Sequence, residues 1–273
     1  MRGLGRPLDT ICHMPTHVRD ATDEDLPGIA EISVASDTDS GTEPEYVRHL
    51  MRDGKVAIAV ADGRPIGFAA ALPIGDVTML ADLFVRPDAQ SAGVGRRLLD
   101  HVLAGSTDRM TCASQDPRAI ALYSRAGMSA RWAMLYLSGP ALPPGGPTNP
   151  ITVEEAAARE YAWTGADRTS SYRYWTASGG AALAVGAPNE PLAVAAVEPG
   201  AVRHLALAPG ADPTAAVRDA LAASRAKSVF LPSVHPALPS LLADSWRITD
   251  FDLYMTSMAH SPEPTGVFHP GLA

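Results

Sequence analysis

A pair of glycines between two patterned segments is the first feature of the sequence that could do chemistry. The stretch VRPDAQSAGVGRRLLDHV, residues 85–102, begins at the end of an apolar run and continues with apolar residues at helical spacing. Gly93 and Gly95 let backbone N–H groups approach an anion, and the start of a helix adds unpaired donors and partial positive charge. Arg96 and Arg97 follow directly. These residues predict an anion-binding loop, although two such glycines also suit a tight strand-to-helix turn without a ligand.

Two common phosphate-binding motifs do not fit this loop. A dinucleotide fingerprint needs a third glycine where the chain has Leu98, and a P-loop needs Gly-Lys-Ser/Thr, which the sequence lacks. Instead, Gln90-x-x-Gly93-x-Gly95 resembles the acetyl-CoA signature of the GCN5-related N-acetyltransferases (GNAT). The segment DPRAIALYSRAGM, residues 116–128, resembles the next motif of that family at Ala119, Leu122, Tyr123 and Gly127.

The resemblance covers residues 15–138 and implies a GNAT fold with acetyl-CoA as the cofactor. It implies that the backbone of Leu83, Phe84 and Val85 pairs with the pantetheine of the cofactor. The diphosphate would lie on Gln90, Ser91, Ala92, Gly93, Val94, Gly95, Arg96 and Arg97, although Arg97 also suits a solvated helix face. Asp116 stands where the family has Asn; it is a candidate cofactor contact, and before Pro117 it is also a good helix N-cap.

Two side chains are candidates for proton transfer. An amine with a pKa near 10.4 must lose a proton before it attacks a thioester, and the resemblance suggests Asp82 as the base. It suggests Tyr123 as the donor to the leaving thiolate. The alternatives are a carboxylate satisfied by backbone donors and a core tyrosine. Strand periodicity puts Asp82 and Phe84 on one face, unless a bulge shifts the alternation.

The acceptor would be a small-molecule or peptide amine. Glu43, Glu45 and Tyr46 fall where the family builds its acceptor pocket, although an acidic helix start explains them equally well. Three residues further along the chain could wall the same pocket: Asp167, Arg168 and Trp175. His49, His101, His204 and His235 lack ligand spacing, so we expect no metal site.

The order of elements predicts an α/β (α+β) fold with a mixed, mostly antiparallel central sheet flanked by helices, duplicated in tandem. LFVRPDAQSAGVGRRLL from Leu83 aligns without gaps with LALAPGADPTAAVRDAL from Leu205, where Ala215 and Val217 replace the two glycines. We therefore expect one acetyl-CoA site. Chance similarity between alanine-rich segments is the alternative to a duplication. The predicted parts are a disordered leader (1–14), a GNAT domain (15–138), a proline-rich linker (139–150), a degenerate GNAT-like domain (151–258) and a flexible tail (259–273).

Composition narrows the class of protein. The 273 residues carry a net charge of −8, which disfavours a nucleic-acid binder, and no apolar run has the length of a membrane span. Two cysteines, Cys12 and Cys112, are too few for a disulfide framework and suit a cytoplasmic protein. The sequence leaves a monomer and a homodimer both open, since the duplicated half could replace a partner subunit or sit beside one. Two alternatives to an acetyltransferase remain: a non-catalytic acyl-CoA sensor or scaffold, and a transferase of a longer acyl group, for which Ala81 and Ala92 would leave room.

Overall fold

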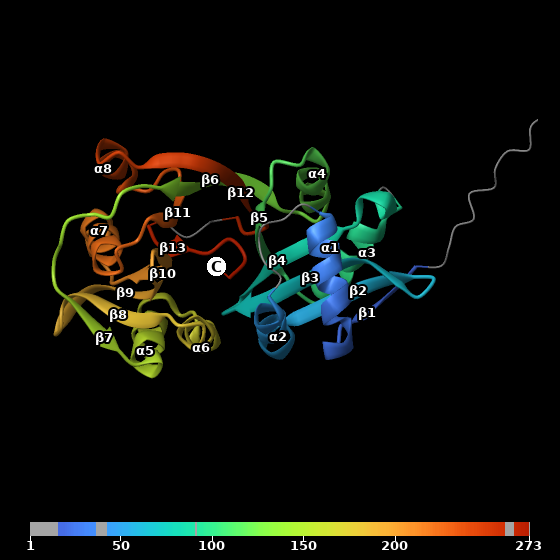
Figure 1. Ribbon diagram of the computed structural model, residues 1–273, viewed down its shortest axis with the longest axis horizontal. Coiled ribbons are helices and arrows are strands. Elements are labelled where there is room, and N and C mark those ends of the chain that lie inside the picture. Colours follow the sequence, from blue (N-terminus) through green and yellow to red (C-terminus); the bar gives the residue numbers. More distant parts are fainter. Residues whose placement is uncertain (1–15, 37–42, 91, 260–264, 273) are drawn as a thin grey trace, which may run out of the picture.

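The chain folds into two halves with the same order of elements (Figure 1). The structure is a computed structural model that describes residues 16–36, 43–90, 92–259 and 265–272. The first half contains β1 (His17–Asp20), the short 3-10 helix η1 (Asp23–Asp25), α1 (Leu26–Ala35), α2 (Pro44–Asp53), β2 (Lys55–Ala61), β3 (Arg64–Ile74), β4 (Val77–Val85), η2 (Pro87–Ala89), α3 (Val94–Val102), β5 (Asp108–Ala113), α4 (Pro117–Arg125) and β6 (Ser129–Ser138). The second half contains β7 (Thr148–Ile151), α5 (Val153–Thr164), α6 (Thr169–Ala177), β8 (Ala181–Ala187), β9 (Glu190–Glu198), β10 (Ala201–Leu207), α7 (Pro213–Ala223), β11 (Ser228–Pro232), α8 (Leu238–Ala243), β12 (Arg247–Thr256) and β13 (Val267–Phe268).

Local sequence signals account for the turns that precede the site. Gly54 ends α2 with its N–H bonded to the carbonyl of Leu50. Asp62 and Gly63 both have positive φ, 50° and 74°, as a two-residue hairpin between β2 and β3 requires. Gly75, at a φ of 57°, turns the chain into β4, the strand that carries the site. The order of elements in the first half is the one that the sequence predicts.

All strands belong to one mixed sheet that is mostly antiparallel, as predicted. Its order is β1-β2-β3-β4-β5-β12-β6-β11-β10-β9-β8-β7, with β13 paired to β10 off this path. The only parallel pairs among the described strands are β4 with β5 and β10 with β11. The halves exchange their final strands, since β12 pairs with β5 and β6 pairs with β11. Neither half therefore completes its sheet with its own strands.

Helices cover both faces of this sheet. On one face, α3 and α4 bury Leu98 and Tyr123 against the first half, and α7 buries Leu221 against the second. On the other face, one core combines α1 and α2 of the first half with α5 and α6 of the second. Ile29 and Trp175 belong to this shared core. The halves thus share buried apolar surface, which stabilises their relative placement.

A bulge occurs at the same place in each half. In β4 the register with β3 shifts between Leu80 and Asp82, so Ala81 is the extra residue. In β10 it shifts between Val202 and His204, leaving Arg203, which the ungapped alignment pairs with Ala81. Directly before the bulges, the parallel pairings end at Leu80↔Thr111 and Val202↔Val229. Beyond these points the paired strands separate in both halves.

The C-terminal segment is ordered against both halves, whereas several other predicted segments lie outside the described residues. The predicted leader and Ser91 lie outside the described residues, as do positions 260–264. Residues 265–272, predicted to belong to a flexible tail, instead form β13 and bury Val267 and Leu272. Their apolar side chains find partners in both halves, which local sequence patterns do not reveal. Among the described residues, no helix is both long and apolar enough to cross a membrane.

Candidate functional site

The glycine loop forms an open helix N-terminus. Gly93 is the N-cap of α3 in the left-handed conformation, with φ 76° and ψ 9°, and no side chain among the described residues caps the helix. A Cβ at Gly93 would meet nothing within 4 Å, so only the backbone conformation calls for glycine there. The first N–H groups of α3 consequently point to a place where an external acceptor can bind them.

A cavity of about 870 Å³ lies in front of this helix start, between α3, α4 and the end of β4. Leu83 and Val85 form its apolar wall. The loop side is built from Gln90, Gly93, Val94 and Gly95. Three cationic side chains reach its rim, Arg96, Arg118 and Arg125. The cavity thus combines apolar surface with cationic groups, two of which are paired with carboxylates of the lining: Arg96 with Asp100 at 3.6 Å and Arg118 with Asp116 at 2.8 Å.

Gln90 ties the loop to both neighbouring elements. Its amide donates to the carbonyl of Val85 at 3.1 Å, and its oxygen accepts a short hydrogen bond from Arg118. Arg118 is also paired with Asp116, which caps α4 by accepting from the N–H of Arg118 at 2.8 Å. This pairing lowers the pKa of Asp116. Asp116 therefore acts as the predicted N-cap, and it also lines the cavity.

Not every residue predicted to bind the cofactor reaches the cavity. Arg96 lines it, whereas Arg97 donates to the carbonyl of Thr16 at 3.3 Å and does not. Phe84 points to the opposite face of β4, where it packs on Phe68 with ring centroids 5.5 Å apart. Ala92 is exposed and is not part of the lining. Only the backbone of Phe84 is available to this side.

Asp82 lies on the face of β4 opposite the cavity wall. The Tyr46 hydroxyl on α2 donates to its Oδ2 at 2.9 Å. Burial raises the pKa of Asp82 to about 6, and the hydrogen bond from Tyr46 opposes this rise. Since Phe68 pairs with Phe84 and Ala70 with Asp82, Asp82 and Phe84 share one face. A carboxylate with a pKa near neutrality suits proton transfer at physiological pH.

Tyr123 lies on α4, on the side of β4 opposite Asp82. It is 6 % exposed on α4, and no described residue forms a hydrogen bond with its hydroxyl. Burial raises the pKa of Tyr123, and the carboxylates of Asp82, Asp252 and Asp116 raise it further. The hydroxyl is therefore protonated at neutral pH and able to donate a hydrogen bond. Asp82 thus influences Tyr123 electrostatically, although the two side chains lie on opposite sides of β4 and no described contact joins them.

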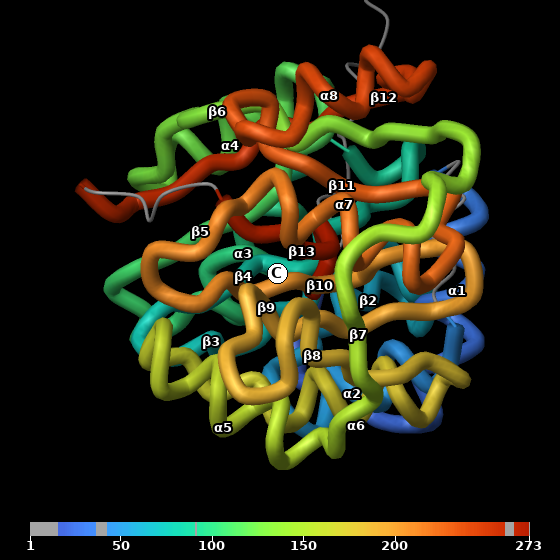
Figure 2. Tube along the Cα trace, turned by 90° about the vertical axis from the view of Figure 1, so that its left-hand side faces the viewer, coloured from blue at the N-terminus to red at the C-terminus, as the bar shows by residue number. Residues whose placement is uncertain are grey.

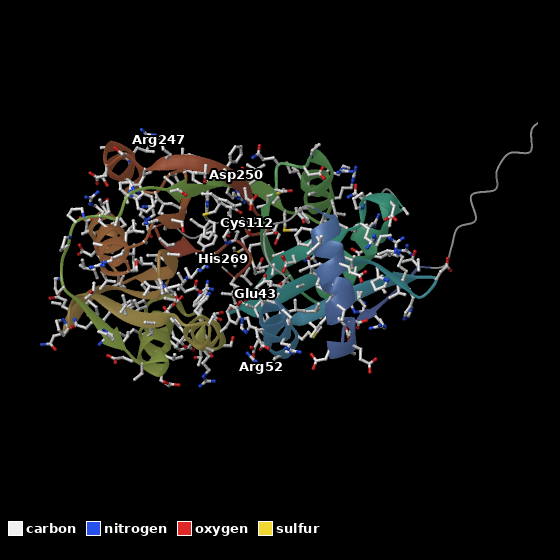
Figure 3. The ribbon with its side chains drawn as sticks, viewed as in Figure 1. Glu43, Arg52, Cys112, Arg247, Asp250 and His269 are labelled. Atoms are coloured by element: carbon white, nitrogen blue, oxygen red, sulfur yellow. The ribbon has the colours of Figure 1, made fainter. Side chains whose placement is uncertain are left out.

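A second carboxylate, which sequence reasoning missed, lies on the face that carries Asp82. Asp252 on β12 accepts from the Tyr136 hydroxyl at 2.5 Å, and burial raises its pKa. It is two residues before Tyr254, which pairs with Cys112 of β5, so all three side chains share this face. Figure 3 labels Cys112 where the two halves meet. No local signal could reveal Asp252, because it reaches the first half only through the strand exchange.

The predicted acceptor residues divide into two groups. Tyr46 contacts Asp82, while Glu43 and Glu45 are exposed near the start of α2. In the second half, Arg168 pairs with Glu160 at 2.8 Å and Asp167 accepts from Thr169. Trp175 is 1 % exposed and stacks on His204. No described contact links this second group to Asp82.

In the second half, a side chain caps α7, the helix that corresponds to α3. Asp212, aligned with Gln90, caps α7 by accepting from the N–H groups of Thr214 and Ala215 at 2.8 and 3.4 Å. Val217, aligned with Gly95, is buried. The linker covers this helix as well, because the N–H of Gly146 donates to Asp219 at 2.8 Å. A carboxylate here occupies the donors that an anion would need.

Comparison with known proteins matches the first half to one family. Residues 23–128 match the family model described as the acetyltransferase (GNAT) family. This match lies wholly within the first half of the chain. A mycothiol acetyltransferase of Clavibacter michiganensis subsp. michiganensis is 37 % identical over 119 residues, covering 40 % of this chain and 39 % of that protein. The chain thus matches less than half of the length of that relative.

Solved structures share the fold of the whole chain. A putative acetyltransferase from Pyrococcus horikoshii has a TM-score of 0.73 at 14 % identity, with 99 % of this chain and 96 % of that chain covered. A GCN5-related N-acetyltransferase from Anabaena variabilis has a TM-score of 0.59 at 15 % identity, with 89 % and 72 % covered. At these identities the likeness concerns the fold alone. It includes the second half as well as the first.

Proposed function

We propose that the protein is an acetyl-CoA-dependent N-acetyltransferase that acts on a primary amine of a small molecule or peptide. One observation carries the proposal: β4 has a cavity at an uncapped helix start on one face and a carboxylate of pKa about 6 on the other. Between them, no described strand pairs with the β5 side of β4 beyond Leu80. A ligand held in the cavity can therefore reach toward Asp82 along a free strand edge.

The residues at the cavity suit coenzyme A. The open N-terminus of α3 and the guanidinium of Arg96 would hold the diphosphate, and the free edge at Leu83 and Val85 would pair with the amides of pantetheine. Gly95 leaves space for such a ligand, because a side chain there would project into the cavity beside Leu83 and Leu122 of its wall. When bound, acetyl-CoA supplies an activated thioester. The second half would hold no second cofactor, since Asp212 caps its helix.

The protein's own groups would move the protons. Asp82 would accept a proton from the acceptor ammonium, directly or through water, which leaves the amine free to attack in a ternary complex. Tyr123 would donate to the departing sulfur. Much of the acceleration would come from holding amine and thioester in line. No group of three or more metal-ligating side chains occurs among the described residues, and the steps proposed for Asp82 and Tyr123 need none.

The test is amine-dependent release of coenzyme A by the full chain. The panel includes small diamines, amino sugars, peptides and, because one relative is a mycothiol acetyltransferase, deacetylated mycothiol. We expect release with at least one amine, initial-velocity lines that intersect, and no acetylated protein by mass spectrometry when amine is omitted. Tight acetyl-CoA binding without turnover on any amine would instead favour an acyl-CoA sensor. Tighter competition by succinyl-CoA would favour a longer acyl donor.

A further inference from the structure

The C-terminal segment, residues 265–272, runs from the second half to the base of the first. β13 pairs with β10 through His204↔Phe268 and Leu205↔Val267, directly beyond the end of the β10–β11 pairing. β13 thus pairs with the edge of β10 beyond the bulge. The corresponding edge of β4 in the first half has no described partner strand. Figure 1 places this segment between the halves, and Figure 2, viewed from the second half, places it near the middle of the molecule.

Several contacts fix this segment. The imidazole Nε2 of His235 lies 2.7 Å from the carbonyl oxygen of Thr265, and Phe268 packs edge-on against Tyr254. His269 accepts from the N–H of Gly271 at 3.1 Å and contacts Phe230 (Figure 3). Leu272 is 2 % exposed in the core shared by both halves. The position of Gly271 is therefore set by anchors on both sides of it.

This path brings a backbone carbonyl to Tyr46. The Tyr46 hydroxyl oxygen lies 2.9 Å from Oδ2 of Asp82 and 3.3 Å from the carbonyl oxygen of Gly271. One hydroxyl proton serves only one of these acceptors at a time. Whichever oxygen is not served can accept an N–H from another donor. A primary ammonium has three N–H groups and can satisfy more than one acceptor at once.

We propose that the C-terminal segment is part of the acceptor site, with the Gly271 carbonyl and the Asp82 carboxylate together positioning the ammonium group of the substrate. This inference rests on the proposed function. Gly271 is a positioning residue: its carbonyl orients the amine, while Asp82 takes the proton. Tyr46 then serves as the shared donor when no substrate is bound. The second half would contribute to the reaction by holding this segment in place.

The decisive variant is Gly271→Ala. A Cβ at this position would lie 2.7 Å from the Tyr46 hydroxyl, so the carbonyl, the hydroxyl or both must move. We expect the KM for the amine to rise about tenfold, since hydrogen bonds to charged groups are lost. Displacing Tyr46 also removes the bond that lowers the pKa of Asp82. The acidic limb of kcat/KM should therefore move to higher pH, while coenzyme A affinity stays within twofold. Besides Asp82, the titratable groups packed around this site are Tyr46, Tyr174, whose ring centroid lies 6.2 Å from that of Tyr46, and His269, which accepts from the N–H of Gly271. Tyr123 acts on Asp82 electrostatically from the other side of β4.

Two further variants make the outcome interpretable. Gly145→Ala crowds Oδ1 of Asp219 on the second half in a similar way, far from Asp82, and should leave the KM and the pH profile unchanged. Leu272→Ala removes the anchor without adding atoms and should raise the KM even if Gly271→Ala fails to fold. Wild-type KM and pH profile in folded Gly271→Ala, or in Leu272→Ala, would overturn the inference. Absence of turnover by the wild-type chain on every amine would instead overturn the proposed function.

Discussion

Tyr46 and Asp82 form a hydrogen bond of 2.9 Å that joins α2 to β4, the strand that also borders the cavity. The hydroxyl stabilises the ionised carboxylate, and burial of the site destabilises it. Burial has the larger effect, so the pKa settles at about 6. A poorly solvated carboxylate of this kind reduces the stability of the fold at neutral pH and is useful for proton transfer.

Replacing Asp82 by Asn should separate activity from stability. We expect kcat/KM to fall by about 10²–10⁴, with coenzyme A affinity retained. The folded pKa of about 6 exceeds the unfolded value, so stability falls as pH rises from about 4 to 6. Asp82→Asn should therefore be more stable by roughly 3 kcal/mol at pH 7 and within about 0.5 kcal/mol of wild type near pH 4. Denaturant titrations at both pH values measure this; Asp76→Asn, in an exposed turn, is the control.

The pH dependence of the wild-type enzyme should show the same group. Protonated Asp82 cannot accept a proton, so kcat/KM should decrease tenfold per pH unit below an apparent pKa of about 6. Rates measured between pH 4.5 and 8 with one acceptor test this. If Asp82→Asn keeps the same limb at a lower rate, another group is responsible.

Tyr123→Phe should lower the rate without affecting the cofactor. The hydroxyl has no described hydrogen-bond partner, so its removal leaves no buried group unsatisfied. We expect kcat to fall about 10- to 100-fold, while the melting temperature and coenzyme A affinity stay near wild type. Stopped-flow or steady-state release of coenzyme A measures the effect. An unchanged kcat with chemistry rate-limiting would assign Tyr123 to the core alone.

The glycine loop is tested by a matched pair of substitutions. Gly93→Ala should cost about 1 kcal/mol of stability, because φ is 76° there, and should weaken coenzyme A binding by moving the first N–H groups of α3. Gly105→Ala has a similar backbone strain, at φ 85°, but lies beyond the other end of α3. Gly105→Ala should lose the same stability and keep the affinity for coenzyme A.

A third substitution, Gly95→Val, should abolish coenzyme A binding because its side chain fills the cavity, with little effect on the fold. Calorimetric titration with coenzyme A distinguishes the results of the three variants.

Glu160→Gln should destabilise the second half. Glu160 is buried and pairs with Arg168 at 2.8 Å, and Tyr172 and His204 also contact it. Its pKa is lowered to about 2 by His204 and Arg168, against desolvation, which is the largest effect on it. The stabilisation is therefore present above about pH 4.3 and lost as pH falls toward 2. We expect roughly 3 kcal/mol of lost stability at pH 7. Glu154→Gln, exposed and 3.5 Å from Arg173, should change little.

The sequence allowed the elements of the first half and the glycine loop to be predicted because their signals are local. Asp62-Gly63 specifies a hairpin, and Gly93 specifies a left-handed residue before α3. Two features were beyond such reasoning. Strict alternation would put Leu80 and Asp82 on one face, but the bulge at Ala81 puts them on opposite faces. The exchange that brings Asp252 beside β5 is a pairing between distant segments without a local signature.

The exchanged strands also bear on how the protein is made. β5 obtains its outer neighbour only from β12, which is synthesised more than a hundred residues later. Until residue 256 has been synthesised, the N-terminal half has an unpaired strand edge of the kind that promotes aggregation. Folding of the first half is therefore coupled to translation of the whole second half, and a fragment cut at the linker would lack an interior strand of its own sheet.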